Sequence, residues 1–214
     1  MIVELIGLPG CGKTTVQLAI LENRTFTGYN FVTRDEIVQE SIIYNWKWTL
    51  KIMHLDPRMW KLIKSVNALK KQLPYAEGRQ IWINRFLVMS WAILRNSKEN
   101  LLLDEGIIQY VSSILHEDSA LEYDKVQAVL NCFRGQIGMG YIWIDTSEQI
   151  CLQRIRQRNR SNDRYNKIES DEELLRMLQF KKENIMAIAG MADVKFKLTS
   201  DGNMDKLDLE RYLD

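Results

Sequence analysis

The chain has 214 residues, of which 46% are hydrophobic, and its 29 Lys and Arg against 28 Asp and Glu give a formal net charge of +1. This length fits a single domain, 1–214, and the composition excludes a disordered chain. A net charge near zero excludes general attraction to nucleic acid or an anionic membrane, so an anionic ligand must be bound locally.

Targeting signals and membrane spans are not predicted. The N-terminus has no basic region or cleavage site, and the longest apolar stretch, 86–94, is too short to cross a bilayer. The three cysteines match no disulfide framework or zinc pattern, so we expect reduced thiols in a cytoplasmic protein without a membrane partner.

Short apolar runs alternate with helical patterns along the chain. Buried strands are predicted at 2–6, 30–33, 101–104, 141–145 and 194–199. Helices are predicted at 13–23, 37–53, 57–72, 77–96, 108–116, 123–133, 147–158, 171–191 and 205–212. The alternation predicts an α/β fold with a parallel sheet covered on both faces. Ligands of such sheets bind at the carboxyl ends of the strands.

Residues 7–14 read GLPGCGKT and match the Walker A pattern G-x-x-x-x-G-K-[ST]. The match follows a predicted strand and begins a predicted helix, which is the setting that this phosphate loop requires. Lys13 would reach the β and γ phosphates, and Thr14 would coordinate Mg²⁺. We therefore predict that ATP and Mg²⁺ are bound here, with ATP contacting Gly7, Gly10, Cys11, Gly12, Lys13, Thr14 and Thr15.

Carboxylates follow the second and third predicted strands. Asp35 could accept a proton from an acceptor hydroxyl or orient it, or it could instead cap the following helix. Arg34 could bind an acceptor phosphate or pair with an acid. Asp104 ends an apolar run, as in a Walker B motif that holds Mg²⁺, and Glu105 is a rival for the base.

The segment 151–167 concentrates positive charge. It holds six basic residues and one acid, a net +5, which leaves −4 for the rest of the chain. Arg154, Arg158 and Arg160 are predicted to bind nucleotide phosphates from a lid at 154–167 that closes over ATP, with Arg154 and Arg158 also stabilising transfer. The alternatives are a solvated basic face or a nucleic-acid patch.

The long helical stretch between the second and third strands is rich in tryptophan, with five of the six Trp between 46 and 91. We interpret 35–97 as a helical insertion that binds the phosphate acceptor, although the aromatics also fit the core of a helical subdomain. Arg79 and Arg85, together with Arg34 and Asp35, are the predicted acceptor-binding residues.

Together these motifs resemble the nucleoside and nucleotide kinases of the P-loop superfamily. GLPGCGKTT resembles their phosphate loop, and the segment from Tyr141 to Asp163 resembles the fourth strand, helix and lid of deoxynucleoside and thymidylate kinases. The deoxynucleoside kinase lid, R-x-x-x-R-x-R-x-x-E, is matched by Arg154, Arg158, Arg160 and Asp163. The resemblance implies a three-layer fold with five parallel strands in the order 2-3-1-4-5, ATP and Mg²⁺ as ligands, and kinase activity.

Departures from the motifs of these families leave the identity of the phosphate acceptor undetermined. Asp104-Glu105-Gly106 lacks the Arg that follows the acid in both families, and Arg34-Asp35 also resembles polynucleotide 5′-kinases, although Val38 stands where those place a second Arg. We predict transfer of the γ-phosphate from ATP to a small acceptor, with nucleosides and nucleoside monophosphates leading. A regulatory ATPase without acceptor and a polynucleotide 5′-kinase are the alternatives. No nucleic-acid partner is expected, and a homodimer is left open.

Overall fold

The computed structural model describes residues 1–22, 30–37, 56–71, 79–115, 123–134, 138–158, 164–192 and 196–200. Within these ranges one sheet is formed by β1 (Ile2–Ile6), β2 (Phe31–Thr33), β3 (Asn100–Leu103), β4 (Met139–Ile144) and β5 (Phe196–Ser200). The strand order is β2-β3-β1-β4-β5, and every pair is parallel. This confirms the predicted fold class and strand order.

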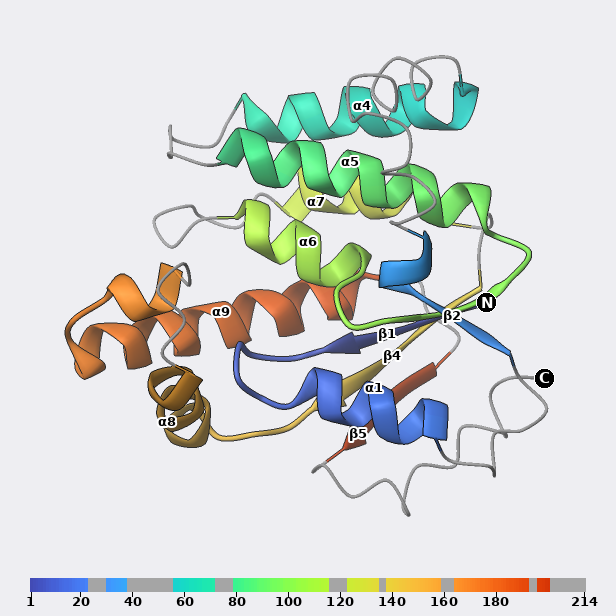
Figure 1. Ribbon diagram of the computed structural model, residues 1–214. Coiled ribbons are helices and arrows are strands. Elements are labelled where there is room, and N and C mark those ends of the chain that lie inside the picture. Colours follow the sequence, from blue (N-terminus) through green and yellow to red (C-terminus); the bar gives the residue numbers. More distant parts are fainter. Residues whose placement is uncertain are drawn as a thin grey trace.

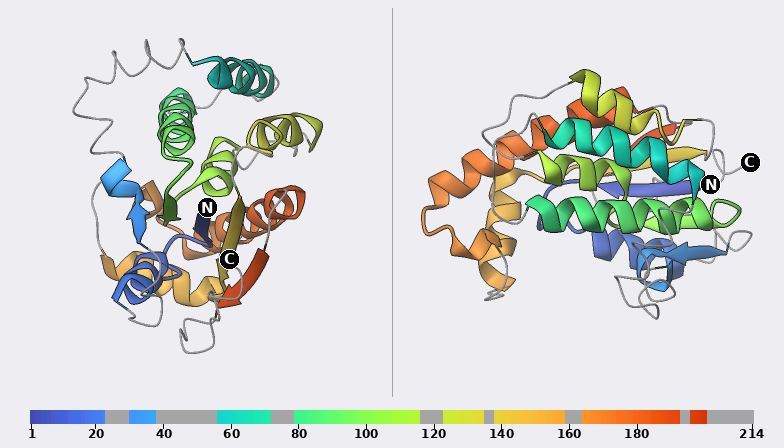
Figure 2. Two further views of the ribbon diagram at one scale, coloured as in Figure 1. Left: turned by 90° about the vertical axis from the view of Figure 1, so that its right-hand side faces the viewer. Right: turned by 90° about the horizontal axis from the view of Figure 1, so that it is seen from above.

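Helices cover both faces of the sheet, as Figures 1 and 2 show. They are α1 (Lys13–Glu22), α4 (Pro57–Lys70), α5 (Arg79–Arg95), α6 (Ile107–Ile114), α7 (Tyr123–Leu130), α8 (Glu148–Arg158) and α9 (Asp171–Met191). In Figure 1, α1 and α8 lie below the sheet, whereas α4, α5, α6, α7 and α9 lie above it. The predicted three layers are confirmed. The helices predicted at 37–53 and 205–212 lie outside the described residues.

The central strand β1 separates two hydrophobic cores because its side chains alternate between the faces of the sheet. Ile2 and Ile6 pack with the helices of the upper layer in Figure 1, and Val3 and Leu5 pack with α1 and α8. All five β1 residues are buried, including Glu4, which is fully inaccessible. The strand is therefore covered on both sides, as its apolar run predicts, with one charged exception.

Helix ends follow the sequence signals closely. Asp56 caps α4 by accepting the Arg58 N–H, and Pro57 follows at the first helical position. Ser170 caps α9 by accepting the Glu173 N–H. None of the described helices combines the length and the apolar character that a bilayer crossing demands.

Candidate active site

The phosphate loop connects β1 to α1 and lies at the carboxyl end of the central strand. Gly10 has φ = +83°, and an added Cβ there would lie 2.8 Å from the backbone oxygen of Cys151. Both the left-handed backbone and this close approach to α8 demand glycine. Glycine at position 10 therefore allows the loop to pack closely against α8.

Replacing Gly10 by alanine is expected to lower the free energy of unfolding by about 2 kcal/mol, because the side chain meets backbone in a disfavoured conformation. Gly190→Ala is the matched control. It lies inside α9 with nothing within 4 Å of an added Cβ, and it should stabilise the chain by about 0.5–1 kcal/mol. Chemical denaturation of both variants measures the difference, and equal effects would contradict the account of Gly10.

Two cations contact the carbonyl oxygens of the phosphate loop. Lys13 Nζ lies 3.0 Å from the Gly7 oxygen and 3.1 Å from the Leu8 oxygen. Arg154, from α8, donates through one nitrogen to the oxygens of Gly10 and Cys11, each at 3.2 Å. Lys13 and Arg154 are thus brought to the same loop although 141 positions separate them in the sequence.

The remaining residues predicted to bind nucleotide differ in placement. Cys11 is buried, with its Sγ 3.8 Å from Lys13 Nζ, whereas Thr14 and Thr15 are exposed at the start of α1. Arg158 is exposed one turn after Arg154 on α8. Arg160 and part of the predicted lid lie outside the described residues.

The end of β2 is shaped by a reciprocal cap between Thr33 and Glu36. Glu36 Oε2 accepts from the Thr33 backbone N–H at 2.6 Å and from its hydroxyl at 2.7 Å, and the Glu36 N–H points back to the Thr33 hydroxyl at 3.4 Å. This is a capping box, and T-x-x-E at 33–36 is its sequence signature. Residues 34–37 are helical and directly follow Thr33, so Thr33 and not Asp35 stands at the cap position, and Asp35 is exposed. The alternative that Asp35 is the cap is therefore wrong for these residues, and the rest of the helix predicted at 37–53 lies outside the described ranges.

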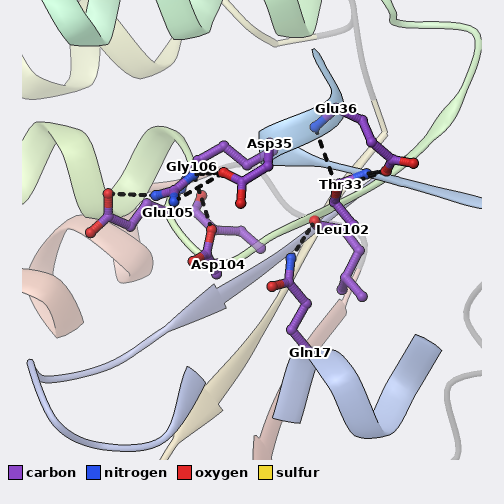
Figure 3. Close-up of polar contacts among 10 residues, drawn as sticks. Gln17, Thr33, Asp35, Glu36, Leu102, Asp104, Glu105 and Gly106 are labelled. Carbon is purple, nitrogen blue, oxygen red and sulfur yellow. Dashed lines mark hydrogen bonds and ion pairs between the residues drawn. The ribbon is translucent and has the colours of Figure 1, made fainter. Parts of the chain in front are cut away.

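Arg34 joins three carboxylates at the carboxyl ends of β2 and β3. Its guanidinium lies 2.8 Å from Glu105 Oε2, 3.3 Å from Asp104 Oδ1 and 3.3 Å from Asp35 Oδ1. Figure 3 shows the side chains of Asp35, Asp104 and Glu105 close to one another at the ends of these two strands. Burial lowers the pKa of Arg34, but the charges of Asp104 and Glu105 outweigh this and raise it. Pairing with acids, one of the two roles predicted for Arg34, is confirmed, and acceptor binding stays a prediction.

Among the described residues, one carboxylate oxygen of Asp104 has an ion-pair partner but no hydrogen bond. Its Oδ1 is buried and accepts no hydrogen bond within the described part of the chain, because Arg34 Nε is close but poorly aligned. Buried oxygens of this kind are uncommon, and a cation is one group that can satisfy them. No group of three or more His, Cys, Asp or Glu in the described ranges is arranged to hold a metal alone. A magnesium ion at Asp104 would therefore need further oxygens, which ATP phosphates and Thr14 can supply.

Tyr110, on α6, interacts with Glu105 and lies beside aromatic and basic side chains of α5. Burial and the charge of Glu105 raise the pKa of Tyr110 to about 12, and Arg34 and Arg85 oppose this increase. Trp82 lies 6.3 Å from Tyr110 between ring centroids, and the Arg85 guanidinium lies 5.2 Å from the centre of the Trp82 ring. Arg85 therefore borders the site from α5.

Arg79 is placed differently from the other predicted acceptor-binding residues. It is buried, its Nε donates to the Ile114 oxygen at 3.2 Å, and one of its terminal nitrogens has no partner among the described residues. Burial lowers its pKa. The contact with Ile114 places Arg79 at the end of α6, away from the Arg34 cluster at the other end of that helix.

Sequence reasoning missed Glu4 and Gln109. Glu4 accepts hydrogen bonds from the backbone N–H groups of Gly106, Ile108 and Gln109 at 2.9–3.1 Å, and the Gln109 side chain accepts one from the Gly7 N–H at 3.4 Å. Burial raises the pKa of Glu4 to about 7 and outweighs these donors, which favour the carboxylate. A single charge inside an apolar strand was the signal for Glu4, whereas no sequence signal marked Gln109.

The comparison with protein families identifies the class. A model described as the AAA domain matches residues 2–182, so the chain belongs to this family of P-loop proteins. The predicted membership of the P-loop superfamily is confirmed. A search of curated proteins found no match.

Solved structures similar to this chain include three of deoxyadenosine kinase from M. mycoides. One has the products dCMP and a flexible dCDP bound, one has dCTP and one has dATP, and their identities are 14%, 16% and 15%. The matches cover 99–100% of this chain and 94–95% of theirs, with TM-scores of 0.46, 0.46 and 0.47. Likenesses this distant carry no argument about the site.

Proposed function

We propose that the protein is an ATP-dependent phosphotransferase that moves the γ-phosphate to a small acceptor, with nucleosides and nucleoside monophosphates as the leading classes. The observation that carries this proposal is that a set of basic side chains and a set of carboxylates lie at the same edge of the sheet. Lys13 and Arg154 contact the loop that follows β1, and the carboxylates around Arg34 lie at the ends of the neighbouring strands β2 and β3. A kinase needs both a triphosphate site and a group that orients the acceptor.

On the donor side, Lys13 and Arg154 would exchange loop carbonyls for phosphate oxygens. Both contact neutral acceptors at 3.0–3.2 Å, and an anionic phosphate oxygen is a stronger partner for either cation. The backbone N–H groups of the loop and the start of α1 would surround the phosphates. Within this proposal Arg158 and Arg160 act from the lid at 154–167.

On the acceptor side, Asp35 and Glu105 are the candidate bases. The Asp35 side chain is 77% exposed and contacts Arg34 only at 3.3 Å or more, whereas Glu105 is 40% exposed and held at 2.8 Å. The looser carboxylate is freer to accept a hydrogen bond from an acceptor hydroxyl, which favours Asp35. Arg85 and the aromatic rings of Trp82 and Tyr110 would border the acceptor, in the insertion 35–97.

Within this proposal, Thr14 and Asp104 would hold magnesium. The buried Asp104 oxygen and the exposed Thr14 hydroxyl are oxygen ligands, which Mg²⁺ prefers. When bound with ATP, the ion neutralises charge on the phosphates during transfer. We place the activity in the cytoplasm, which the three free and buried cysteines support.

ATP binding and acceptor-dependent ADP release test the proposal together. Isothermal titration with ATP and Mg²⁺ should show binding to the wild type and about tenfold weaker binding to Lys13→Ala, because one charged contact is lost. Lys98→Ala, at an exposed position after α5, is the control and should bind like the wild type. Equal binding by the wild type and Lys13→Ala would show that the mechanism is wrong.

A panel of nucleosides, nucleoside monophosphates and sugars then identifies the acceptor by stimulated ADP release. Membership of the AAA domain family favours one competing function, an ATPase that hydrolyses ATP without an acceptor. ADP release that is the same with every acceptor and without any would support this ATPase and reject the transferase.

A further inference from the structure

A buried polar connection joins β1, the start of α6 and the phosphate loop. Its members are Glu4, which is fully inaccessible, and Gln109, which is 5% exposed. Neither belongs to the Walker motifs, and neither is a group proposed to touch substrate. Buried polar side chains need a compensating role or full hydrogen bonding, because burying them costs free energy.

Glu4 holds the turn that follows the Walker B acid. Its Oε1 accepts from the Gly106 N–H at 3.1 Å and the Gln109 N–H at 2.9 Å, and its Oε2 accepts from the Ile108 N–H at 3.0 Å. An added Cβ at Gly106 would lie 2.7 Å from the Glu4 carboxyl carbon. The turn Asp104–Glu105–Gly106 is therefore packed directly onto Glu4 and fixed there by backbone hydrogen bonds.

Gln109 extends the connection to the phosphate loop. Its side-chain oxygen accepts the N–H of Gly7, the first residue of the loop, at 3.4 Å, while its own N–H donates to Glu4. Three hydrogen bonds thus lead from Gly106 through Glu4 and Gln109 to Gly7. They link the segment that carries the carboxylates to the segment that would carry ATP.

We propose that Glu4 and Gln109 are positioning residues that hold the Asp104–Glu105–Gly106 turn and the phosphate loop at a fixed separation. This inference rests on the proposed function. The donor phosphate and the acceptor-orienting carboxylates would sit on the two linked segments, so a loss of the link misplaces them relative to each other. Misplacement of reacting groups lowers the rate of transfer more than it lowers the affinity for either substrate.

Gln109→Met tests the proposal, because methionine has nearly the same size and no oxygen to accept the Gly7 N–H. The kcat is expected to fall about tenfold, with KM for ATP changed less than twofold. Gln17→Met is the matched control. Gln17 is also buried, and its side chain donates to the Leu102 oxygen in β3 at 3.2 Å (Figure 3). Among the described residues its side chain makes no hydrogen bond to the loop or the turn. This control should lose stability but keep kcat.

Amide hydrogen exchange gives a second readout that needs no catalytic activity. In the nucleotide-free protein, Gln109→Met should speed exchange at Gly7, which loses its acceptor, while residues 106–109 keep Glu4 as their acceptor. Gln17→Met should leave exchange at both places unchanged. If the wild type transfers no phosphate but this exchange pattern is found, the proposed function fails and the link stands. The link is overturned if Gln109→Met exchanges like the wild type, or if both variants lose kcat equally.

Discussion

Replacing Arg34 by methionine is expected to lower the free energy of unfolding by about 3 kcal/mol near neutral pH. The guanidinium contacts Asp35, Asp104 and Glu105, and its side chain is only 24% exposed. Methionine keeps much of the apolar stem but leaves Asp104 and Glu105 as neighbouring carboxylates without this cation. Breaking a largely buried ion pair by removing one partner typically costs about 3–5 kcal/mol, and the partial exposure of Glu105 places the effect at the lower end.

A second change in the same chain tests the electrostatic origin of this loss. Adding Glu105→Gln to Arg34→Met removes one of the uncompensated charges and should recover about 1 kcal/mol or more. Arg58→Met is the control, because Arg58 pairs with Asp56 at 2.7 Å on α4, outside the Arg34 cluster. It should cost less and leave phosphate transfer intact. Denaturation curves of the three variants give the comparison, and no recovery in the double variant would contradict charge repulsion.

The Arg34 cluster also shows what the sequence could and could not predict. Asp35, Asp104 and Glu105 were predicted as functional acids because each follows an apolar strand, and parallel strands place such residues on one edge. Their common contact with Arg34 depends on β2 and β3 being neighbours and on a side-chain conformation, which periodicity does not report. Sequence patterns therefore predicted that these carboxylates lie at one edge and that Arg34 could pair with an acid, but not that Arg34 contacts all three.

Local signals predicted the fold better than long-range ones. β1 and α9 have the predicted bounds, since an apolar run ending in a glycine motif and a Ser170 cap are both local features. The T-x-x-E box at Thr33 is equally local, but it was missed, and the cap was considered only as an alternative role of Asp35. By contrast, Arg154 contacts the phosphate loop and Gln109 contacts Gly7, and more than 100 positions separate the partners of each contact. A single sequence does not specify contacts between such distant positions.

The buried Glu4 is expected to make the stability of the protein fall as pH rises from about 4.5 to about 7. Its pKa is raised from 4.5 to about 7 by burial, with only backbone N–H donors opposing. Between these values the unfolded chain has released the proton and the folded chain still holds it, so rising pH favours unfolding. The shift corresponds to roughly 3 kcal/mol, and above pH 7 both states are ionised and the effect is constant.

Unfolding free energies of the wild type and Glu4→Gln across pH 4–8 isolate this contribution. The difference in unfolding free energy between the wild type and the variant should shrink from about pH 4.5 to about pH 7 and then stay constant. Parallel curves would refute the raised pKa of Glu4. If Glu4→Gln does not fold, carboxyl ¹³C NMR of the wild type decides, because one glutamate should titrate near pH 7.

A carboxylate at this position is costly at neutral pH, yet only its two oxygens together can accept all three N–H groups around Gly106. Glu4 therefore lowers the stability of the fold at neutral pH, but it fixes the conformation of the turn at the site.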